Sequence, residues 1–246
     1  MDLKIYVSMH KPSPYPESDW LVPIGIGGYS EDGIINDAGG RSISSENHAY
    51  CELTAQYWVR HNRPSSFVGF CHYRRYLSFD TRGLPPNDML YASQLSVVDS
   101  LADGNQRAHC ETLLSNFDLI VPRSTFCPWG IKEQIISGGM SEIIWDYFRR
   151  AVSIAAPEQG RYVNRLDLLQ YAHFFNMYVM RWADFCRYFD NMYRVLQAYR
   201  VLVAEVDGAS FSGNRWPAIL SERYFNLWLS TSGMSAVQVP IVRLPD

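Results

Sequence analysis

The apolar and polar positions of this chain alternate between two patterns. Short apolar or β-branched runs predict strands over residues 3–8, 21–26, 66–71, 117–121, 174–180 and 237–242. Apolar residues at i, i+3, i+4 and i+7 spacing predict helices over residues 46–61, 89–101, 141–154, 182–204 and 217–229. Strands that alternate with helices predict an α/β fold with a mostly parallel central sheet flanked by helices, and a ligand site at the carboxyl ends of its strands.

Length and composition predict one globular domain. The chain has 246 residues, of which 47% are apolar and 19% charged, which is far from the composition of a disordered segment. No internal repeat, low-complexity tract or convincing linker divides it. We therefore expect a single domain over residues 1–246.

Charge and cysteine content limit the expected partners and compartment. A net charge of -3 offers no broad field for a polyanion, so no nucleic-acid partner is expected. The odd set of five cysteines without a C-x-x-C pair favours reduced thiols. Because there is neither a leader-like start nor an apolar run of ~18 residues, we expect a cytoplasmic protein with at most peripheral contact at the inner membrane.

The most distinctive local feature is the sequence His72-Tyr73-Arg74-Arg75-Tyr76, directly after a predicted strand. Guanidinium groups bind phosphate oxygens in bidentate geometry and stay charged, so adjacent arginines at a strand end suit a diphosphate. A solvated basic turn with packed tyrosines explains the same residues. His10 and Arg123 also follow predicted strands and are expected at the same edge of the sheet.

The sequence contains no Asp-x-Asp pair of the kind that holds a divalent metal in many sugar transferases. Glu17 with Asp19, and Glu205 with Asp207, are the nearest substitutes, and each is more typical of a solvated pair. We therefore predict no cofactor and no metal ligands, with cationic side chains in place of a metal, although metal assistance stays open.

Two other carboxylates are candidates for chemistry. Glu222 lies beside Arg223 on a predicted helix and could act as a general base, but an ordinary surface ion pair is an equal alternative. Glu52 lies in an apolar and aromatic stretch, where an unpaired carboxylate would be costly. We therefore expect it either to pair with a cation, such as Arg74 or Arg75, or to lie at the rim of the site.

Other common motifs are missing. There is no Gly-x-x-x-x-Gly-Lys-Ser/Thr loop, no Gly-x-Ser-x-Gly elbow and no His-x-x-x-His pair. Hydrolase and zinc-enzyme hypotheses therefore rank low.

Five blocks of sequence, taken together, resemble one family. They are Ile5 to Pro12, Asn47 to Trp58, Gly69 to Tyr76, Asn176 to Met180 and Ser221 to Leu229. The family is the domain found in capsular and exopolysaccharide biosynthesis glycosyltransferases, formerly of unknown function. The blocks span nearly the whole chain, and the His-Tyr-Arg-Arg-Tyr block is the most specific of them.

This resemblance implies a GT-A-like, Rossmann-related fold, a UDP-sugar donor and a lipid-linked glycan acceptor, and some members look like galactofuranosyltransferases. It implies donor or diphosphate contacts from His10, Lys11, Asp37, Asn47, Glu52, His72, Arg74, Arg75 and Arg223. Tyr73 and Asn176 are the implied sugar or acceptor contacts. Glu222 is the implied base, with Asp37, Glu52 and Asp207 as alternatives. The turn Gly39-Gly40-Arg41 departs from the more acidic family pattern, which leaves the identity of the donor open.

Three functions follow as hypotheses. The first is an enzyme that transfers a sugar, with galactofuranose as one candidate, to a glycan of a bacterial capsule, exopolysaccharide or O-antigen, with inversion. The second is a non-catalytic sugar-nucleotide or glycan-binding module in a polysaccharide assembly complex, which would tolerate loss of Glu222. The third, a glycoside hydrolase, needs two facing carboxylates, and the sequence suggests no such pair.

Overall fold

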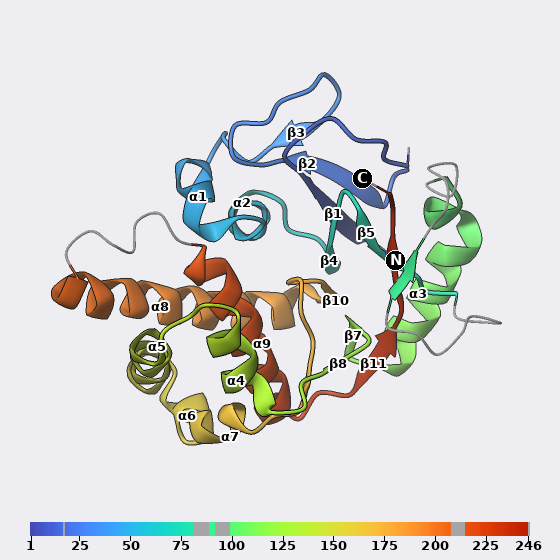
Figure 1. Cartoon of the computed structure of the whole chain (residues 1–246). Coiled ribbons are helices and arrows are strands. Elements are labelled where there is room, and N and C mark those ends of the chain that lie inside the picture. Colours follow the sequence, from blue (N-terminus) through green and yellow to red (C-terminus); the bar gives the residue numbers. More distant parts are fainter. Residues whose placement is uncertain (17, 81–88, 92–98, 208–214, 246) are drawn as a thin grey trace.

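The computed structural model describes residues 1–16, 18–80, 89–91, 99–207 and 215–245, without the side chains of 89–91 and 205–207. Its centre is a sheet in the order β11-β7-β10-β4-β1-β2-β3 (Figure 1). These strands are β1 (Leu3–Met9), β2 (Leu21–Gly25), β3 (Ile35–Asn36), β4 (Phe67–His72), β7 (Leu119–Pro122), β10 (Tyr178–Arg181) and β11 (Ala236–Val239). Only β10 runs antiparallel to its neighbours along this path of described strands, so the predicted mostly parallel sheet is confirmed.

Shorter strands extend one edge of this sheet. After β4 the chain turns back into β5 (Arg75–Leu77), which pairs with β12 (Ile241–Arg243), and β12 also pairs with β6 (Met89–Tyr91). A separate two-stranded sheet joins β8 (Thr125–Phe126) to β9 (Tyr171–Ala172). The turn between β4 and β5 carries Tyr73 and Arg74 to the edge where the parallel strands end.

Helices cover both faces of the sheet. One face carries α3 (Gly104–Asn116), and the other packs against a larger group of helices (Figure 1). This group comprises α1 (Asn47–Tyr50), α2 (Leu53–Asn62), α4 (Gly130–Ser137), α5 (Glu142–Ala155), α6 (Pro157–Gly160), α7 (Val163–Asp167), α8 (Trp182–Asp207) and α9 (Trp216–Ser232). The 3-10 turns η1 (Ser44–Glu46) and η3 (Asp99–Ala102) complete the described elements.

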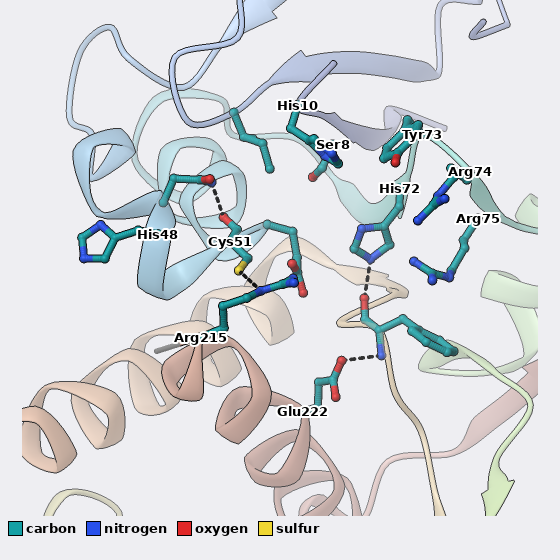
Figure 2. A pocket seen from close by; sticks show the side chains of 14 residues that line it. Ser8, His10, His48, Cys51, His72, Tyr73, Arg74, Arg75, Arg215 and Glu222 are labelled. Carbon is teal, nitrogen blue, oxygen red and sulfur yellow. Dashed lines mark hydrogen bonds between the residues drawn. The ribbon is translucent and has the colours of Figure 1, made fainter. Parts of the chain in front are cut away.

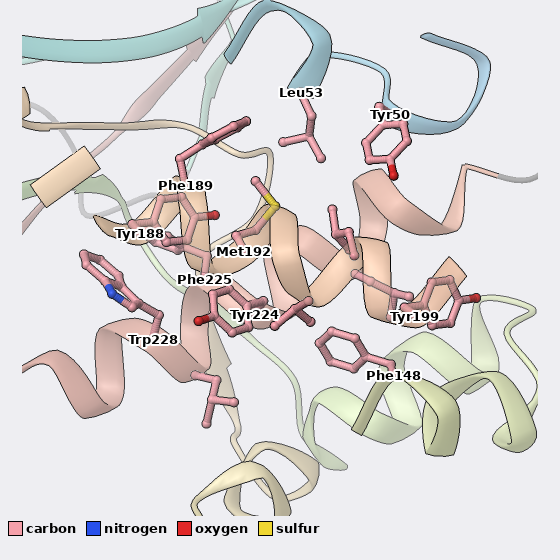
Figure 3. Packing of buried hydrophobic residues seen from close by; sticks show 14 of the residues in the cluster. Tyr50, Leu53, Phe148, Tyr188, Phe189, Met192, Tyr199, Tyr224, Phe225 and Trp228 are labelled. Carbon is pink, nitrogen blue, oxygen red and sulfur yellow. The ribbon is translucent and has the colours of Figure 1, made fainter. Parts of the chain in front are cut away.

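The alternation of side chains along β1 shows how the sequence fills two cores. Leu3, Ile5 and Val7 pack toward the α3 side, whereas Tyr6 packs into the larger core between the sheet and α2, α5, α8 and α9. Aromatic rings fill much of that larger core, where Tyr188, Phe225 and others interlock between α8 and α9 (Figure 3). A strand that is apolar on both faces is thereby buried on both faces.

Two predicted elements differ from the structure. The helix expected over 46–61 is interrupted at Cys51 (φ 46°), which separates α1 from α2. The helix expected over 89–101 is wrong at its start, because Met89–Tyr91 form strand β6, and residues 92–98 lie outside the described part. Helix α3 was missed because only Cys110 and Leu114 of its residues are buried, which leaves almost no apolar periodicity.

The strand expected over 174–180 begins only at Tyr178, and the residues before it form a turn in the site. The helices predicted over 141–154, 182–204 and 217–229 are confirmed as α5, α8 and α9. Within the described residues, no helix is both long and apolar enough to span a bilayer.

Candidate active site

A cavity of about 640 Å³ lies where β1 and β4 end (Figure 2). These two strands are parallel and pair Ser8 with His72, so the residues that follow them meet at one edge of the sheet. The volume falls within the range of roughly 300–1,000 Å³ that is typical of small-molecule sites. Its lining comprises Ser8, His10, Ile26, Asn47, His48, Cys51, Glu52, His72, Tyr73, Arg74, Arg75, Phe175, Arg215 and Glu222.

Most of the site residues named from the sequence line this one cavity. They are His10, Asn47, Glu52, His72, Tyr73, Arg74, Arg75 and Glu222. They come from β1, the α1–α2 region, the β4–β5 turn and α9, which are far apart in the sequence. The fold therefore gathers residues that the sequence could nominate only one block at a time.

Four of the residues implied as ligand contacts do not line the cavity, and neither does Arg123, which we expected at the same edge of the sheet. The exposed Lys11 lies with its Nζ 5.5 Å from the centre of the Tyr73 ring. Asp37 is buried and accepts hydrogen bonds from Ser42 and Ser44, so it stabilises the turn of residues 37–44. The two others, Asn176 and Arg223, are buried behind the lining and act on it through hydrogen bonds.

Arg215 is a lining residue that the sequence did not suggest. It is the N-cap residue of α9, and its Nε donates to Sγ of Cys51 at 3.0 Å (Figure 2). Pro217 indicated the start of this helix, but nothing in the sequence placed the residue two positions earlier opposite the α1–α2 break. Arg215 adds a third guanidinium group to the cavity.

Glu222 is held at the cavity wall by two donors. One carboxylate oxygen accepts the backbone N–H of Phe175 at 2.7 Å, and the other accepts from Arg223 at 2.6 Å. Burial raises the pKa of Glu222 to about 7, although the charge of Arg223 opposes the shift and that of Glu52 adds to it. A carboxyl group with such a pKa can take up or release a proton near neutral pH.

Arg223 supports Glu222 from behind. Its guanidinium also donates to Oε1 of Gln134 on α4 at 2.6 Å and lies 4.7 Å from the centre of the Phe174 ring. Burial lowers the pKa of Arg223, and the nearby Glu222 carboxylate opposes that shift. The alternative interpretation, an ordinary surface ion pair, is therefore wrong, because the Glu222–Arg223 pair is largely buried and orients the carboxylate.

A two-residue turn links the two carboxylates of the cavity. Phe175 (φ 73°) and Asn176 (φ 51°) both adopt left-handed backbone conformations. The carbonyl of Phe175 accepts from Nε2 of His72 at 2.6 Å, while the Asn176 amide donates to Glu52 at 2.7 Å. Glu52 thus lines the cavity, in agreement with the second of its two predicted positions, and accepts a hydrogen bond from an amide.

Asn176 is itself fixed by α9. Its amide nitrogen also donates to the carbonyl of Ala218 at 3.2 Å, and its amide oxygen accepts from the Ser221 hydroxyl at 2.9 Å. With 5% of its surface exposed, Asn176 lies behind the lining and supports Glu52, and its predicted contact with a sugar or acceptor stays a prediction.

The opposite wall of the cavity is cationic. The guanidinium of Arg75 lies 4.8 Å from the centre of the Phe175 ring, and that of Arg74 lies 5.2 Å from the Tyr73 ring. Burial, together with Arg74 and Arg243, lowers the pKa of Arg75. Nε of Arg75 is buried and has no hydrogen-bond partner among the residues that the structure describes. The guanidinium groups of Arg74 and Arg75 in the lining favour an anionic ligand.

His10 shares this wall, and burial and the neighbouring cations lower its pKa. Its ring packs edge-on against Tyr73, with 4.9 Å between the ring centres. A neutral imidazole here can accept or donate a hydrogen bond without adding charge.

The described residues contain no group of three histidine, cysteine or acidic side chains placed to hold a metal ion. Of the predicted substitutes for a metal-binding pair, Asp19 forms a surface ion pair with Arg107 at 2.9 Å. Glu17 and the side chains of Glu205 and Asp207 lie outside the described part.

Fold and site together define an α/β protein whose pocket, at the ends of parallel strands, is lined by Arg74, Arg75 and Arg215 and by the carboxyl groups of Glu52 and Glu222. The chain belongs to the family described as Domain of unknown function (DUF4422), whose model matches residues 4–233.

One solved structure shares this fold. It is described as the apo structure of the bifunctional glycosyltransferase WbbM, with a TM-score of 0.86 and 22% sequence identity. The similarity covers 100% of the present chain and 46% of that one, so the chain spans less than half the length of its structural relative. No curated protein matches the chain.

Proposed function

We propose that this protein is a glycosyltransferase that uses a UDP-sugar donor and a glycan acceptor. The observation that carries the proposal is the composition of a single cavity, in which Arg74, Arg75 and Arg215 accompany Glu222, a carboxyl with a pKa of about 7. Sugar transfer with inversion needs two functions, stabilisation of the leaving diphosphate and removal of a proton from the acceptor hydroxyl. The shared fold with a bifunctional glycosyltransferase supports the same class.

In this mechanism the arginines bind the diphosphate of the donor. Fixed guanidinium groups neutralise the negative charge that develops as the bond from the sugar to the diphosphate breaks, with no metal ion required. Arg75 lines the cavity, so its guanidinium can donate to a phosphate oxygen. Arg74 and Arg215 add charge from the β4–β5 turn and from the start of α9.

Glu222 is the proposed general base. Once deprotonated, it accepts the proton of the acceptor hydroxyl while the hydroxyl oxygen attacks the anomeric carbon, and direct displacement inverts that carbon. Arg223 and the Phe175 N–H keep the carboxylate oriented. Glu52 lines the same cavity and raises the pKa of Glu222 through its charge.

The finer assignments extend this proposal: a GT-A-type enzyme of the hexosyltransferase class, a lipid-linked acceptor, and a role in bacterial capsule, exopolysaccharide or O-antigen synthesis, with galactofuranose as one candidate sugar. They rest on the sequence resemblance and on the shared fold. A non-catalytic binding module would use the same arginines, but it would have no need of a buried carboxyl that titrates near neutral pH.

Replacement of Glu222 separates these functions. We expect Glu222→Gln to bind UDP as the wild type does, while the release of UDP from UDP-sugars in the presence of lipid-linked glycans falls by about 10²-fold or more, the usual contribution of a general base. The control is Arg150→Ala, which replaces an exposed residue on α5 and should change neither UDP binding nor UDP release. Turnover that survives in Glu222→Gln contradicts the role of the base, and UDP binding without any turnover by the wild type favours the binding module.

A further inference from the structure

The imidazole of His72 is joined to the carboxyl of Glu222 through a single residue. His72 is the last residue of β4, where it pairs with Ser8 on β1 and with Arg75 on β5. Its Nε2 lies 2.6 Å from the carbonyl oxygen of Phe175, and the N–H of the same Phe175 donates to Glu222 at 2.7 Å (Figure 2). The end of a central strand is thus connected with the proposed base.

The partner of His72 determines which of its ring nitrogens carries a proton. A carbonyl oxygen only accepts hydrogen bonds, so Nε2 of His72 is the donor to Phe175. In the neutral ring, Nδ1 then has a lone pair and no proton. The oxygens of a diphosphate are acceptors as well, so the neutral ring is a poor ligand for them. This geometry favours another role than the diphosphate contact that the family resemblance implies.

The turn of Phe175 and Asn176 needs support from outside. Both residues have a positive φ, 73° and 51°, which is uncommon for residues with a side chain and costs free energy. Relaxation of Phe175 to a negative φ would rotate its N–H relative to its carbonyl. The hydrogen bonds with Glu222 and His72 could not both persist after such a rotation, so together they fix the conformation of Phe175.

His72 holds a different part of this turn from the other contacts. The carbonyl of Asn176 accepts from Nε2 of Gln56 at 3.0 Å, and the side chain of Asn176 is bonded to α9. The carbonyl of Phe175 belongs to the peptide group between the two left-handed residues, and it accepts from His72. The imidazole of His72 therefore orients this peptide group.

The backbone of His72 is firmly placed for this task. Strand β4 lies inside the sheet, between β1 and β10, and Phe70 and Cys71, which precede His72, are buried. The N–H of Tyr73, which follows it, donates to the carbonyl of Ser8 at 3.1 Å. A side chain that extends from a rigid strand holds a group more precisely than one that extends from a loop.

We propose that His72 is a positioning residue for Glu222, which it holds in place through the carbonyl and the N–H of Phe175. This role rests on the proposed function, in which Glu222 takes the proton of the acceptor hydroxyl. Without the bond from His72, the Phe175 N–H would turn away and the carboxylate would lose its alignment with the acceptor. The pKa of Glu222 would also rise further, because the hydrogen bond from Phe175 lowers it.

Two substitutions with amide side chains separate the two ring nitrogens of His72. The amide nitrogen of glutamine reaches about as far from the backbone as Nε2, whereas that of asparagine reaches only as far as Nδ1. We expect His72→Gln to release UDP from UDP-sugars with a kcat close to that of the wild type. His72→Asn should lower kcat by about 10- to 100-fold, through misalignment of the base. Calorimetry should show the same affinity for UDP in both variants and in the wild type.

The pH dependence distinguishes positioning from a general structural defect. The acid limb of the kcat profile should move to higher pH in His72→Asn and not in His72→Gln, because only the first variant raises the pKa of Glu222. The other charged or titratable groups near Glu222 are the same in both variants: Arg223, Glu52, Arg215, Cys51 and Tyr188.

A second measurement does not need activity. Urea denaturation at about pH 5 and about pH 8 should show a larger loss of stability with rising pH for His72→Asn than for His72→Gln. The reason is that a folded-state pKa further above the unfolded value gives a larger stabilisation at low pH, which is lost as Glu222 ionises.

The matched control is His109→Ala, because Nδ1 of His109 also lies 2.7 Å from a backbone carbonyl, that of Asn105, away from the cavity lining. It should change neither kcat nor UDP affinity. Four results overturn the proposal: equal kcat in His72→Gln and His72→Asn, a greater loss in His72→Gln, loss of UDP affinity in both, or equal pH dependence of their stability. A wild type that binds no UDP contradicts the proposed function instead, and the denaturation experiment still tests the link between His72 and Glu222.

Discussion

At the scale of single residues, the site depends on how burial changes the pKa of common side chains such as Glu222. Glu222 and Arg223 could be nominated from the sequence, because adjacent opposite charges on a helix stand out. The burial of these two residues could not be predicted, since it depends on Gln134, Phe174 and Phe175, which belong to other elements. The sequence therefore predicted the candidate base but not its pKa.

The raised pKa of Glu222 makes stability depend on pH. Its pKa is 4.5 in the unfolded chain and about 7 in the folded protein, so the folded state binds the proton more tightly. Between these values unfolding releases a proton, and the free energy of unfolding must fall as pH rises, by up to about 3 kcal/mol from this group.

Urea denaturation at about pH 5 and about pH 8 measures this effect, and Glu222→Gln supplies the reference. The wild type should lose more stability than the variant over this interval, because the glutamine cannot ionise. An equal change in both proteins contradicts the raised pKa.

At the scale of elements, strong apolar periodicity predicted the helices correctly, whereas local breaks in the elements could not be predicted. The long helices α5, α8 and α9 follow from apolar spacing alone. The break at Cys51 and the turn before β10 did not appear in the sequence pattern, because apolar residues continue across both. Tertiary contacts, such as that between Arg215 and Cys51, accompany these breaks and bring functional groups into the pocket.

The turn at Phe175 and Asn176 gives a test at this scale. Asn176→Ala removes the hydrogen bonds to Glu52, Ala218 and Ser221 and keeps a left-handed conformation that alanine disfavours, so the free energy of unfolding should fall by about 2–4 kcal/mol. Asn176→Gly loses the same bonds without that conformational penalty and should cost about 0.5–1 kcal/mol less.

Chemical denaturation of the two variants measures the difference. If glycine and alanine destabilise the protein equally, the backbone conformation contributes nothing and the amide contacts alone hold the turn. Greater destabilisation by glycine contradicts the account of this turn.

At the scale of the whole molecule, the fold class followed from the order of elements, and the pocket followed from the rule that parallel strands end together. The order of the strands and the antiparallel direction of β10 could not be predicted, because pairing between distant strands leaves no local signal in the sequence. The larger core contains residues from Tyr6 to Trp228, as one folding unit requires. The single-domain assignment is consistent with this core and stays a prediction.

The central claim is that the pocket binds the diphosphate of a sugar nucleotide through its own cations. Calorimetric titration of the chain with UDP, with and without a metal chelator, measures this most directly. Binding should survive chelation and weaken by at least about tenfold in Arg75→Ala, the loss of one charge-assisted hydrogen bond, while Arg150→Ala behaves as the wild type does. No binding of UDP by the wild type, or binding that Arg75→Ala leaves unchanged, would contradict the account.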